Sequence, residues 1–142
     1  MTSRKAEARW NGSLREGAGR LTVQSGAVDV AYDFRSRFET GQATNPEELL
    51  GAAHAGCFTM AIAAALAREG LAPTWIHTTA SVHLNQGAAG FEIPKIELRT
   101  RAQIAGVDAA KFLEIAESAK KNCPLSKALA SVEITLDAAL EA

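Results

Sequence analysis

The sequence predicts an α+β fold in which a largely antiparallel sheet surrounds one long central apolar helix. Residues 49–67 form an almost uninterrupted apolar stretch of alanine, glycine and larger aliphatic side chains. Segments before and after this stretch alternate between apolar and polar residues, which is typical of strands with one buried face. Strands and helices do not alternate regularly along the chain, so a sheet built from repeated parallel crossovers is not expected.

The first third of the chain predicts a small antiparallel meander. Turn signals at Asn11-Gly12 and Ser25-Gly26 separate its segments. The polar residues 35–44 that follow are expected to form a loop. Strands are expected at Ala6–Trp10, Arg20–Gln24 and Ala27–Phe34.

The central helix has clear start and stop signals. Asn45 is a suitable N-cap, Pro46 fits the first helical position, and Glu48 stands three residues after the cap. Gly70 is a natural residue to end the helix. We therefore expect a helix over Pro46–Glu69.

The last part of the chain predicts two long strands, two helices and a final strand. In the second long strand, the alternation changes phase at Pro94-Lys95, which indicates a bulge or a bend. Asp108 is expected to cap a helix, and Pro124 to open a short one that ends near Ala130. Apolar side chains expected on one face of the first of these helices are Phe112, Ile115, Ala116 and Ala119. The three strands are expected at Ile76–Leu84, Phe91–Ile104 and Val132–Leu140.

Size and charge restrict the possible functions. A chain of 142 residues fits one domain, which we expect to span residues 1–142. The formal net charge of −1 argues against nucleic acid or an anionic membrane as a partner. Residues 1–12 contain no apolar core of the kind that a signal peptide needs, so a cytoplasmic protein is expected.

The apolar helix poses a packing problem, because one sheet in a small domain covers only one side of it. Insertion into a membrane is not expected, since alanine and glycine contribute little to insertion and His54 lies within the segment. A second copy of the same helix would solve the problem, and we predict an obligate, intertwined homodimer. Small side chains that would allow close approach are Gly51, Ala52, Ala53, Ala55, Gly56, Ala63 and Ala64.

The chain contains two cysteines, Cys57 and Cys123, and their chemistry remains open at this point. Cys57 lies in the apolar helix, where a free thiol is commonly inert packing because burial raises its pKa. Cys123 lies just before the short helix opened by Pro124, where backbone amides and Lys127 would favour a thiolate. If the two thiols meet in space, they form a redox pair instead.

Other polar side chains near these cysteines have ordinary structural explanations. His54 lies on the same helical face as Cys57, but two cysteines and one histidine fall short of the four ligands of a structural zinc site. A buried histidine bonded to a carbonyl is the simpler interpretation. Arg35 and Arg37 fit a solvated loop, and Glu47 fits the first turn of the helix.

Two stretches carry a resemblance to a known family. The sequence NPEELLGAAHAGCF at residues 45–58 resembles the signature of the OsmC/Ohr family of thiol-dependent hydroperoxidases. The sequence NCPLS at residues 122–126 resembles the second-cysteine motif of that family. The resemblance extends over nearly the whole chain, and His54-Ala55 is closer to the OsmC branch than to the Ohr branch.

The resemblance implies an intertwined homodimer that reduces organic hydroperoxides in oxidative or osmotic stress defence. Cys57 matches the peroxidatic cysteine and Cys123 the resolving cysteine. Arg37 matches the activating arginine, with Arg35 two residues away as the alternative, and Glu47 matches its paired glutamate. The implied cycle passes through a Cys57 sulfenic acid and a Cys57–Cys123 disulfide, which an external dithiol reduces; a lipoyl-type dithiol is one candidate. No metal or organic cofactor is expected.

One geometric constraint follows for this set of residues. On a straight helix, Glu47 and Cys57 are separated by about 15 Å of helical rise. Either the helix start is irregular, or the Arg37–Glu47 pair acts on Cys57 across the dimer, which is the arrangement we expect. The alternative function is a non-enzymatic dimer that binds an apolar ligand and has structural thiols.

Overall fold

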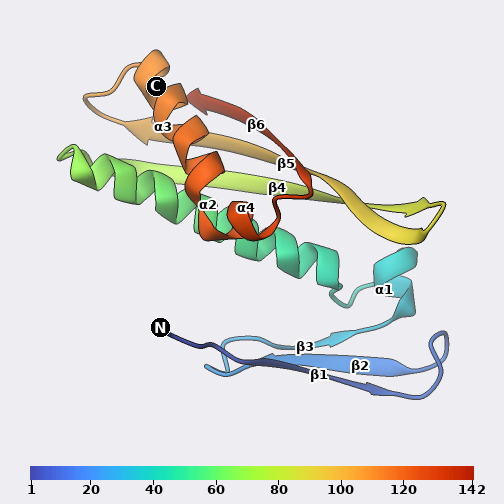
Figure 1. The fold of residues 1–142 in the computed structure, drawn as a ribbon. Helices are drawn as coiled ribbons and strands as arrows, with labels where there is room; N and C mark the ends of the chain where they lie inside the picture. The colour runs from blue at the N-terminus through green and yellow to red at the C-terminus, as the bar shows by residue number, and fades with distance from the viewer. The chain divides into compact units, whose positions relative to one another are not determined.

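The computed structural model describes residues 1–142, which form two compact units, Met1–Leu49 and Leu50–Ala142. Figure 1 labels the helices and strands of both units. Each unit contains a three-stranded sheet of its own. The prediction that residues 1–142 act as one domain stays a prediction.

The first unit is the predicted meander followed by a short helix. Strands β1 (Ala6–Asn11), β2 (Ala18–Val23) and β3 (Asp29–Tyr32) pair antiparallel in sequence order, as expected. The prediction of a loop over residues 35–44 is wrong at its start, because α1 spans Phe34–Phe38. The Asp33 carboxylate caps α1 by accepting the Ser36 backbone N–H at 2.7 Å.

Helix α2 spans Pro46–Arg68 and confirms the predicted central helix. Its first turn is capped by the Asn45 side chain, which accepts the Glu48 backbone N–H at 2.8 Å. At the other end, Gly70 adopts a positive φ of 74° and the Leu71 N–H returns to the Leu66 carbonyl at 3.0 Å. A glycine supports this left-handed conformation without strain, which explains why the helix ends there.

The second unit contains a mixed sheet in the order β4-β5-β6. Strands β4 (Pro73–Gly87) and β5 (Gly90–Ile104) form a long antiparallel hairpin. The predicted bulge is confirmed, because the register shifts between His83 paired with Lys95 and Asn85 paired with Glu92.

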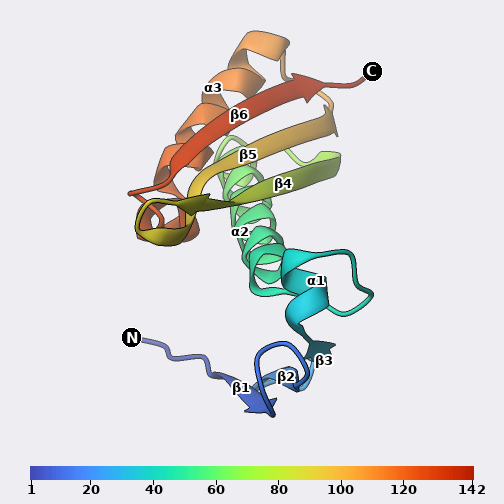
Figure 2. The same ribbon diagram turned by 90° about the vertical axis from the view of Figure 1, so that its right-hand side faces the viewer.

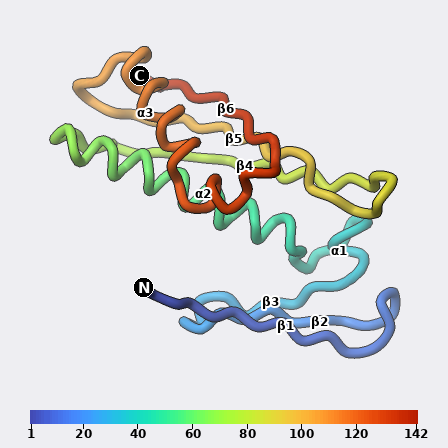
Figure 3. Tube along the Cα trace, in the orientation of Figure 1, coloured from blue at the N-terminus to red at the C-terminus, as the bar shows by residue number.

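The pairing of the strands is largely antiparallel, as expected, and the final strand is the exception. Strand β6 (Glu133–Leu140) pairs parallel with β5. Between them the chain forms α3 (Ala109–Asn122) and α4 (Pro124–Ala128), a connection long enough to return it to the starting end of the sheet. The tube in Figure 3 follows this path from α3 through α4 into β6.

The core of the second unit lies where α2 and α3 cover one face of the sheet (Figure 2). Asp108 caps α3 as predicted, with its carboxylate accepting the Lys111 N–H at 2.8 Å. The predicted apolar face of α3 is buried. Fully or nearly fully buried side chains from the three elements include Phe58, Ile62, Leu66, Ile96, Leu98 and Phe112.

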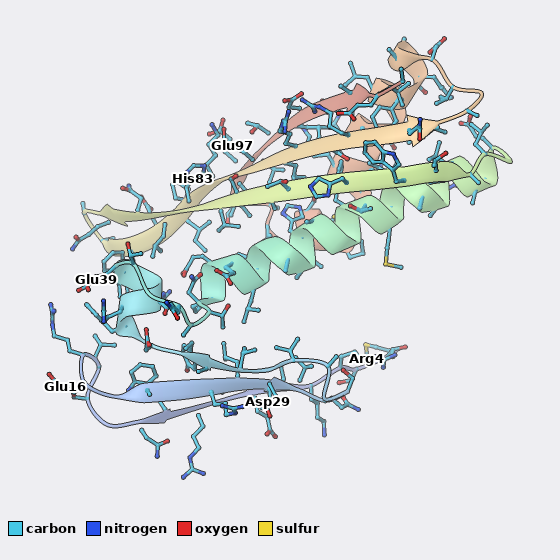
Figure 4. All side chains as sticks on the ribbon, turned by 180° about the vertical axis from the view of Figure 1, so that it is seen from behind. Arg4, Glu16, Asp29, Glu39, His83 and Glu97 are labelled. Carbon is cyan, nitrogen blue, oxygen red and sulfur yellow. The ribbon has the colours of Figure 1, made fainter.

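The opposite face of this sheet carries charged side chains. His83 on β4 and Glu97 on β5 lie next to each other in Figure 4, with 2.6 Å between Nε2 and the carboxylate. Hydrogen bonding from His83 and Lys95 lowers the pKa of Glu97. His83 itself is exposed.

By length and composition alone, α2 could cross a membrane. A single helix of this kind is weak evidence, because core helices pass the same test. In the chain by itself, 28% of its most apolar window is buried. The expectation that α2 is not inserted in a membrane stays a prediction.

Candidate active site

The two cysteines are neighbours in the second unit. Cys57 lies on α2, half-buried, and Cys123 is the residue between α3 and α4, 1% exposed. Both are free thiols, and their side chains interact directly. The sequence left open whether the thiols meet, and the structure places them together.

Local sequence explains the position of Cys123. Pro124 stands at the first position of α4, so Cys123 becomes its N-cap. The Ser126 backbone N–H donates to the Cys123 sulfur at 3.3 Å, as an N-terminal amide does to a capping side chain. This confirms the expected place of Cys123 at the start of the short helix.

The surroundings of Cys57 oppose and favour its ionisation at the same time. Burial raises the pKa of the Cys57 thiol, and the neighbouring Cys123 thiol raises it further. A hydrogen bond from the Leu125 backbone acts in the other direction and lowers this pKa. None of these influences on Cys57 comes from a cation.

A buried hydrogen-bonded chain extends from Cys123 to α2. The Ser126 hydroxyl lies 3.2 Å from the Cys123 sulfur and 2.9 Å from Nε2 of His54. His54 is completely buried, and burial lowers the pKa of its imidazole. The expected bond from His54 to a carbonyl is therefore wrong, since its partner is a serine hydroxyl.

Ser126 is a residue whose part in this cluster the sequence analysis missed. Its position offered a signal, because a side chain three residues after an N-cap is placed to reach back to that cap. The structure contains no group of three or more histidine, cysteine, aspartate or glutamate side chains that could hold a metal ion.

The first unit holds the charged pair. The Arg37 guanidinium donates to both carboxylate oxygens of Glu47, with Nη2 to Oε1 at 2.8 Å and Nε to the two oxygens at 3.2 and 3.3 Å. Glu47 is 7% exposed. The geometry is the bidentate one that orients a guanidinium firmly. Arg35 instead makes a long, exposed contact of 3.8 Å with Glu39.

The structure thus pairs Arg37 with Glu47, but their action on Cys57 stays a prediction. Helix α2 is regular from Pro46 onward. Glu47 and Cys57 are accordingly separated along it by about 15 Å of rise. An irregular helix start does not bring them together.

An open cavity of about 380 Å³ lies beside Cys123 in the second unit. Apolar alanines of α2 form one wall, and Arg68 provides a positive charge. The cavity is lined by Ala61, Ala64, Ala65, Arg68, Ser118, Ala119, Asn122, Cys123 and Pro124.

The chain belongs to the OsmC family. The family model described as OsmC-like protein matches residues 39–137. This is the class to which the fold, the helix-borne cysteine and the second cysteine assign it.

Particular relatives refine this assignment. The chain is 45% identical over 135 residues to Peroxiredoxin OsmC of Escherichia coli (strain K12), with 94% of each chain covered. It is 35% identical over 98 residues to the organic hydroperoxide resistance protein of Xanthomonas axonopodis pv. citri, with 68% of this chain and 67% of that protein covered. The higher identity and coverage confirm that the chain is closer to the OsmC branch.

Solved structures show the same fold. An organic hydroperoxide resistance protein from Elizabethkingia anophelis, with thiocyanate bound, has a TM-score of 0.78 at 23% identity, covering 99% of each chain. The OsmC structure from Legionella pneumophila, described as an organic hydroperoxide resistance protein, has a TM-score of 0.71 at 25% identity. The match covers 95% of this chain and 96% of the Legionella chain.

Proposed function

We propose that this protein is a thiol-dependent peroxidase that reduces organic hydroperoxides to alcohols. Relatives named Peroxiredoxin OsmC and organic hydroperoxide resistance protein support a peroxidase-type role in hydroperoxide defence. The observation that carries the proposal is that two free thiols, Cys57 and Cys123, are neighbours close enough for one to shift the pKa of the other. Such a pair can donate two electrons to a peroxide, which reduces the peroxide and oxidises the two thiols to a disulfide.

The reaction begins at Cys57. Its thiolate attacks one oxygen of the O–O bond, which gives a sulfenic acid on Cys57 and releases the other oxygen as an alcohol after protonation. The Arg37 guanidinium stays charged at all relevant pH values and stabilises both the thiolate and the departing oxygen. Glu47 holds the guanidinium through the bidentate pair.

The Cys123 sulfur then attacks the sulfur of the Cys57 sulfenic acid. A disulfide forms, and the oxygen leaves as water after taking up the thiol proton. An external dithiol reduces the disulfide by exchange and is itself oxidised. A lipoyl-type dithiol fits this requirement, because its two thiols are joined in one molecule.

We place the complete site between two copies of the chain. In the single chain, the side chain of Met60 on α2 is 74% exposed, and Gly56 has open space around it. A homodimer that packs these surfaces would bury them and would let Arg37 and Glu47 of one protomer act on Cys57 of its partner. Not all the predicted small residues are available, because Gly51 faces β4: a Cβ atom there would lie 3.3 Å from the Ala80 carbonyl and the Val82 side chain.

The cavity beside Cys123 has an apolar wall that favours an apolar substrate, although Cys57 itself does not line it. Its alanine wall offers contact to an alkyl group, whereas hydrogen peroxide would gain nothing from it. Among the apolar side chains of α2 close to Cys57 in sequence, Phe58 is fully buried in the core and Met60 is exposed. We place the protein in the cytoplasm, without nucleic acid or membrane partners.

The alternative is a non-enzymatic dimer that binds an apolar ligand. The observation in its favour is that burial raises the pKa of Cys57, which reduces its reactivity. Two results together would support this alternative. The purified protein would retain an apolar ligand tightly, and its thiols would not react with hydroperoxide.

Titration of free thiols distinguishes the two functions. The reduced protein is treated with one equivalent of cumene hydroperoxide per chain, and thiols are counted before and after. We expect both thiols to be lost and a dithiol to restore them. Retention of both thiols would contradict the peroxidase.

A further inference from the structure

The two sulfurs of the proposed disulfide have unequal exposure. Cys57 is half-buried, whereas Cys123 is 1% exposed and belongs to the buried core. Thiol–disulfide exchange requires an approaching thiolate to reach one sulfur while the other sulfur leaves. Exposure alone therefore favours Cys57 as the sulfur that is attacked.

The same two sulfurs also differ in the donors that can hold a departing thiolate. The Cys123 sulfur has the Ser126 backbone N–H at 3.3 Å and the Ser126 hydroxyl at 3.2 Å. Cys57 has a hydrogen bond from the Leu125 backbone. A leaving thiolate departs faster when hydrogen bonds stabilise its charge.

His54 determines where the Ser126 proton points. Its pKa is lowered by burial, so the ring is neutral and has one N–H. Nδ1 is buried without a hydrogen-bond partner, and Nε2 lies 2.9 Å from the Ser126 hydroxyl oxygen. Since an orphaned buried N–H is rare, the network assigns the proton to Nε2, which donates to Ser126. The Ser126 hydroxyl then directs its own proton at the Cys123 sulfur.

We propose that the external reductant attacks the Cys57 sulfur of the disulfide, and that Cys123 leaves as a thiolate stabilised by Ser126, which His54 positions. This inference rests on the proposed function. The reductant thiolate forms a new S–S bond to Cys57, and the Cys57–Cys123 bond breaks with its electron pair on Cys123. The second thiol of the reductant, after losing its proton, attacks the mixed disulfide and releases Cys57. The reductant is oxidised to its disulfide.

A monothiol probe reveals which sulfur is attacked. The full-length protein is oxidised with one equivalent of cumene hydroperoxide and treated with 2-nitro-5-thiobenzoate. The freed protein thiol is trapped at once with N-ethylmaleimide, and peptide mapping locates both groups. We expect thiobenzoate on Cys57 and maleimide on Cys123 in a ratio of about ten to one. Equal labelling, or thiobenzoate mainly on Cys123, would overturn the proposal.

Variants test the parts assigned to Ser126 and His54. Ser126→Ala and His54→Gln are expected to slow thiobenzoate attack by about tenfold and to lower the labelling ratio. Ser126→Thr keeps the hydroxyl and should restore both the rate of thiobenzoate attack and the labelling ratio. Thr59→Val is the matched control, since it removes a hydroxyl of α2 that bonds Thr78 at 2.7 Å. Unchanged ratios in Ser126→Ala and His54→Gln would overturn their assigned parts.

Failure of this inference can be told apart from failure of the proposed function. Diamide also oxidises neighbouring thiols to a disulfide, without any peroxide. If diamide forms the Cys57–Cys123 disulfide and cumene hydroperoxide does not, the peroxidase is contradicted, and the labelling ratio still tests the inference. The wild-type ratio decides the direction of attack even if a variant fails to fold.

Discussion

The two compact units of the chain contribute different chemistry. In Met1–Leu49, an ion pair joins Arg37 of α1 to Glu47 at the start of α2. In Leu50–Ala142, the groups that contact the two cysteines are a serine, backbone amides and, behind the serine, a neutral histidine. The comparison teaches that none of the groups that shift the pKa of Cys57 is a cation, so the proposed mechanism has to draw its positive charge from Arg37.

The largest expected effect concerns the second unit and its cysteines. Cys57→Ser should abolish turnover of an organic hydroperoxide in the presence of a dithiol, because the remaining thiol, Cys123, is only 1% exposed and has no second cysteine with which to form a disulfide. Cys123→Ser should still consume about one equivalent of peroxide per chain, since its first oxidation needs no resolving thiol. Peroxide consumption is measured for both variants. Full activity in Cys57→Ser would contradict the mechanism.

The next effect tests whether the charge of the first unit serves the thiol of the second. Arg37→Ala should slow the first oxidation of Cys57 by about 10²-fold, as the loss of a charged transition-state donor does. Arg35→Ala is the matched control and should change little, because its contact with Glu39 is long and exposed. Stopped-flow measurement of sulfenic acid formation compares the two; equal rates would remove Arg37 from the site.

Mixing two inactive chains tests whether the units cooperate across a dimer. Cys57→Ser and Arg37→Ala chains, denatured and refolded together, should recover about a quarter of wild-type activity at random pairing. Each mixed dimer would hold one site with an intact cysteine and an intact arginine. No recovery in mixtures whose dimers are confirmed by mass would place both residues of a site on one chain.

A smaller effect concerns the connection between α1 and α2. Asn45 caps α2 and also donates from Nδ2 to the Ser36 carbonyl at 2.9 Å. Asn45→Ala should lower the free energy of unfolding by about 1 kcal/mol through loss of the cap. Asn45→Asp keeps a capping oxygen and should lose less. Urea denaturation compares the three proteins, and equal stability would mean that the cap contributes nothing.

The smallest effect is a pH dependence confined to the first unit. The Ser36 backbone N–H lowers the pKa of Asp33 from 3.8. The charged carboxylate therefore adds stability above this value, and the contribution is lost as the pH falls through the lower, folded-state pKa. Asp33→Asn keeps a capping oxygen without the charge. Its melting temperature should be below that of the wild type at pH 6 and approach it in acid; a constant difference would contradict this.

Much of the fold was predictable because its signals are local. Asn45, Pro46 and Gly70 mark the ends of α2, and alternation marks β4 and β5. Helix α1 was missed, since five residues are too few to show a helical period. Alternation also reveals a strand without its direction, so the parallel pairing of β6 could not be read from its residues.

The candidate site was predictable in its residues but not in its contacts. The motifs around Cys57 and Cys123 named both cysteines, yet they are far apart in sequence and only the packing of α4 on α2 brings them together. The bond from His54 to Ser126 has the same origin. Such contacts depend on tertiary packing, which short-range patterns do not encode.

Gly51 has a consequence for the redox chemistry although it contacts neither sulfur. A methyl group there would lie 3.3 Å from both the Ala80 carbonyl and the Val82 side chain, tighter than an ordinary contact. Larger side chains would force α2 away from β4, and Cys57 would move with its helix. A disulfide forms only within a narrow range of separations between its two residues. Under the proposed mechanism, the missing side chain of one glycine therefore affects how readily this protein stores oxidising equivalents as a disulfide, and larger residues there would act as a graded adjustment of that capacity.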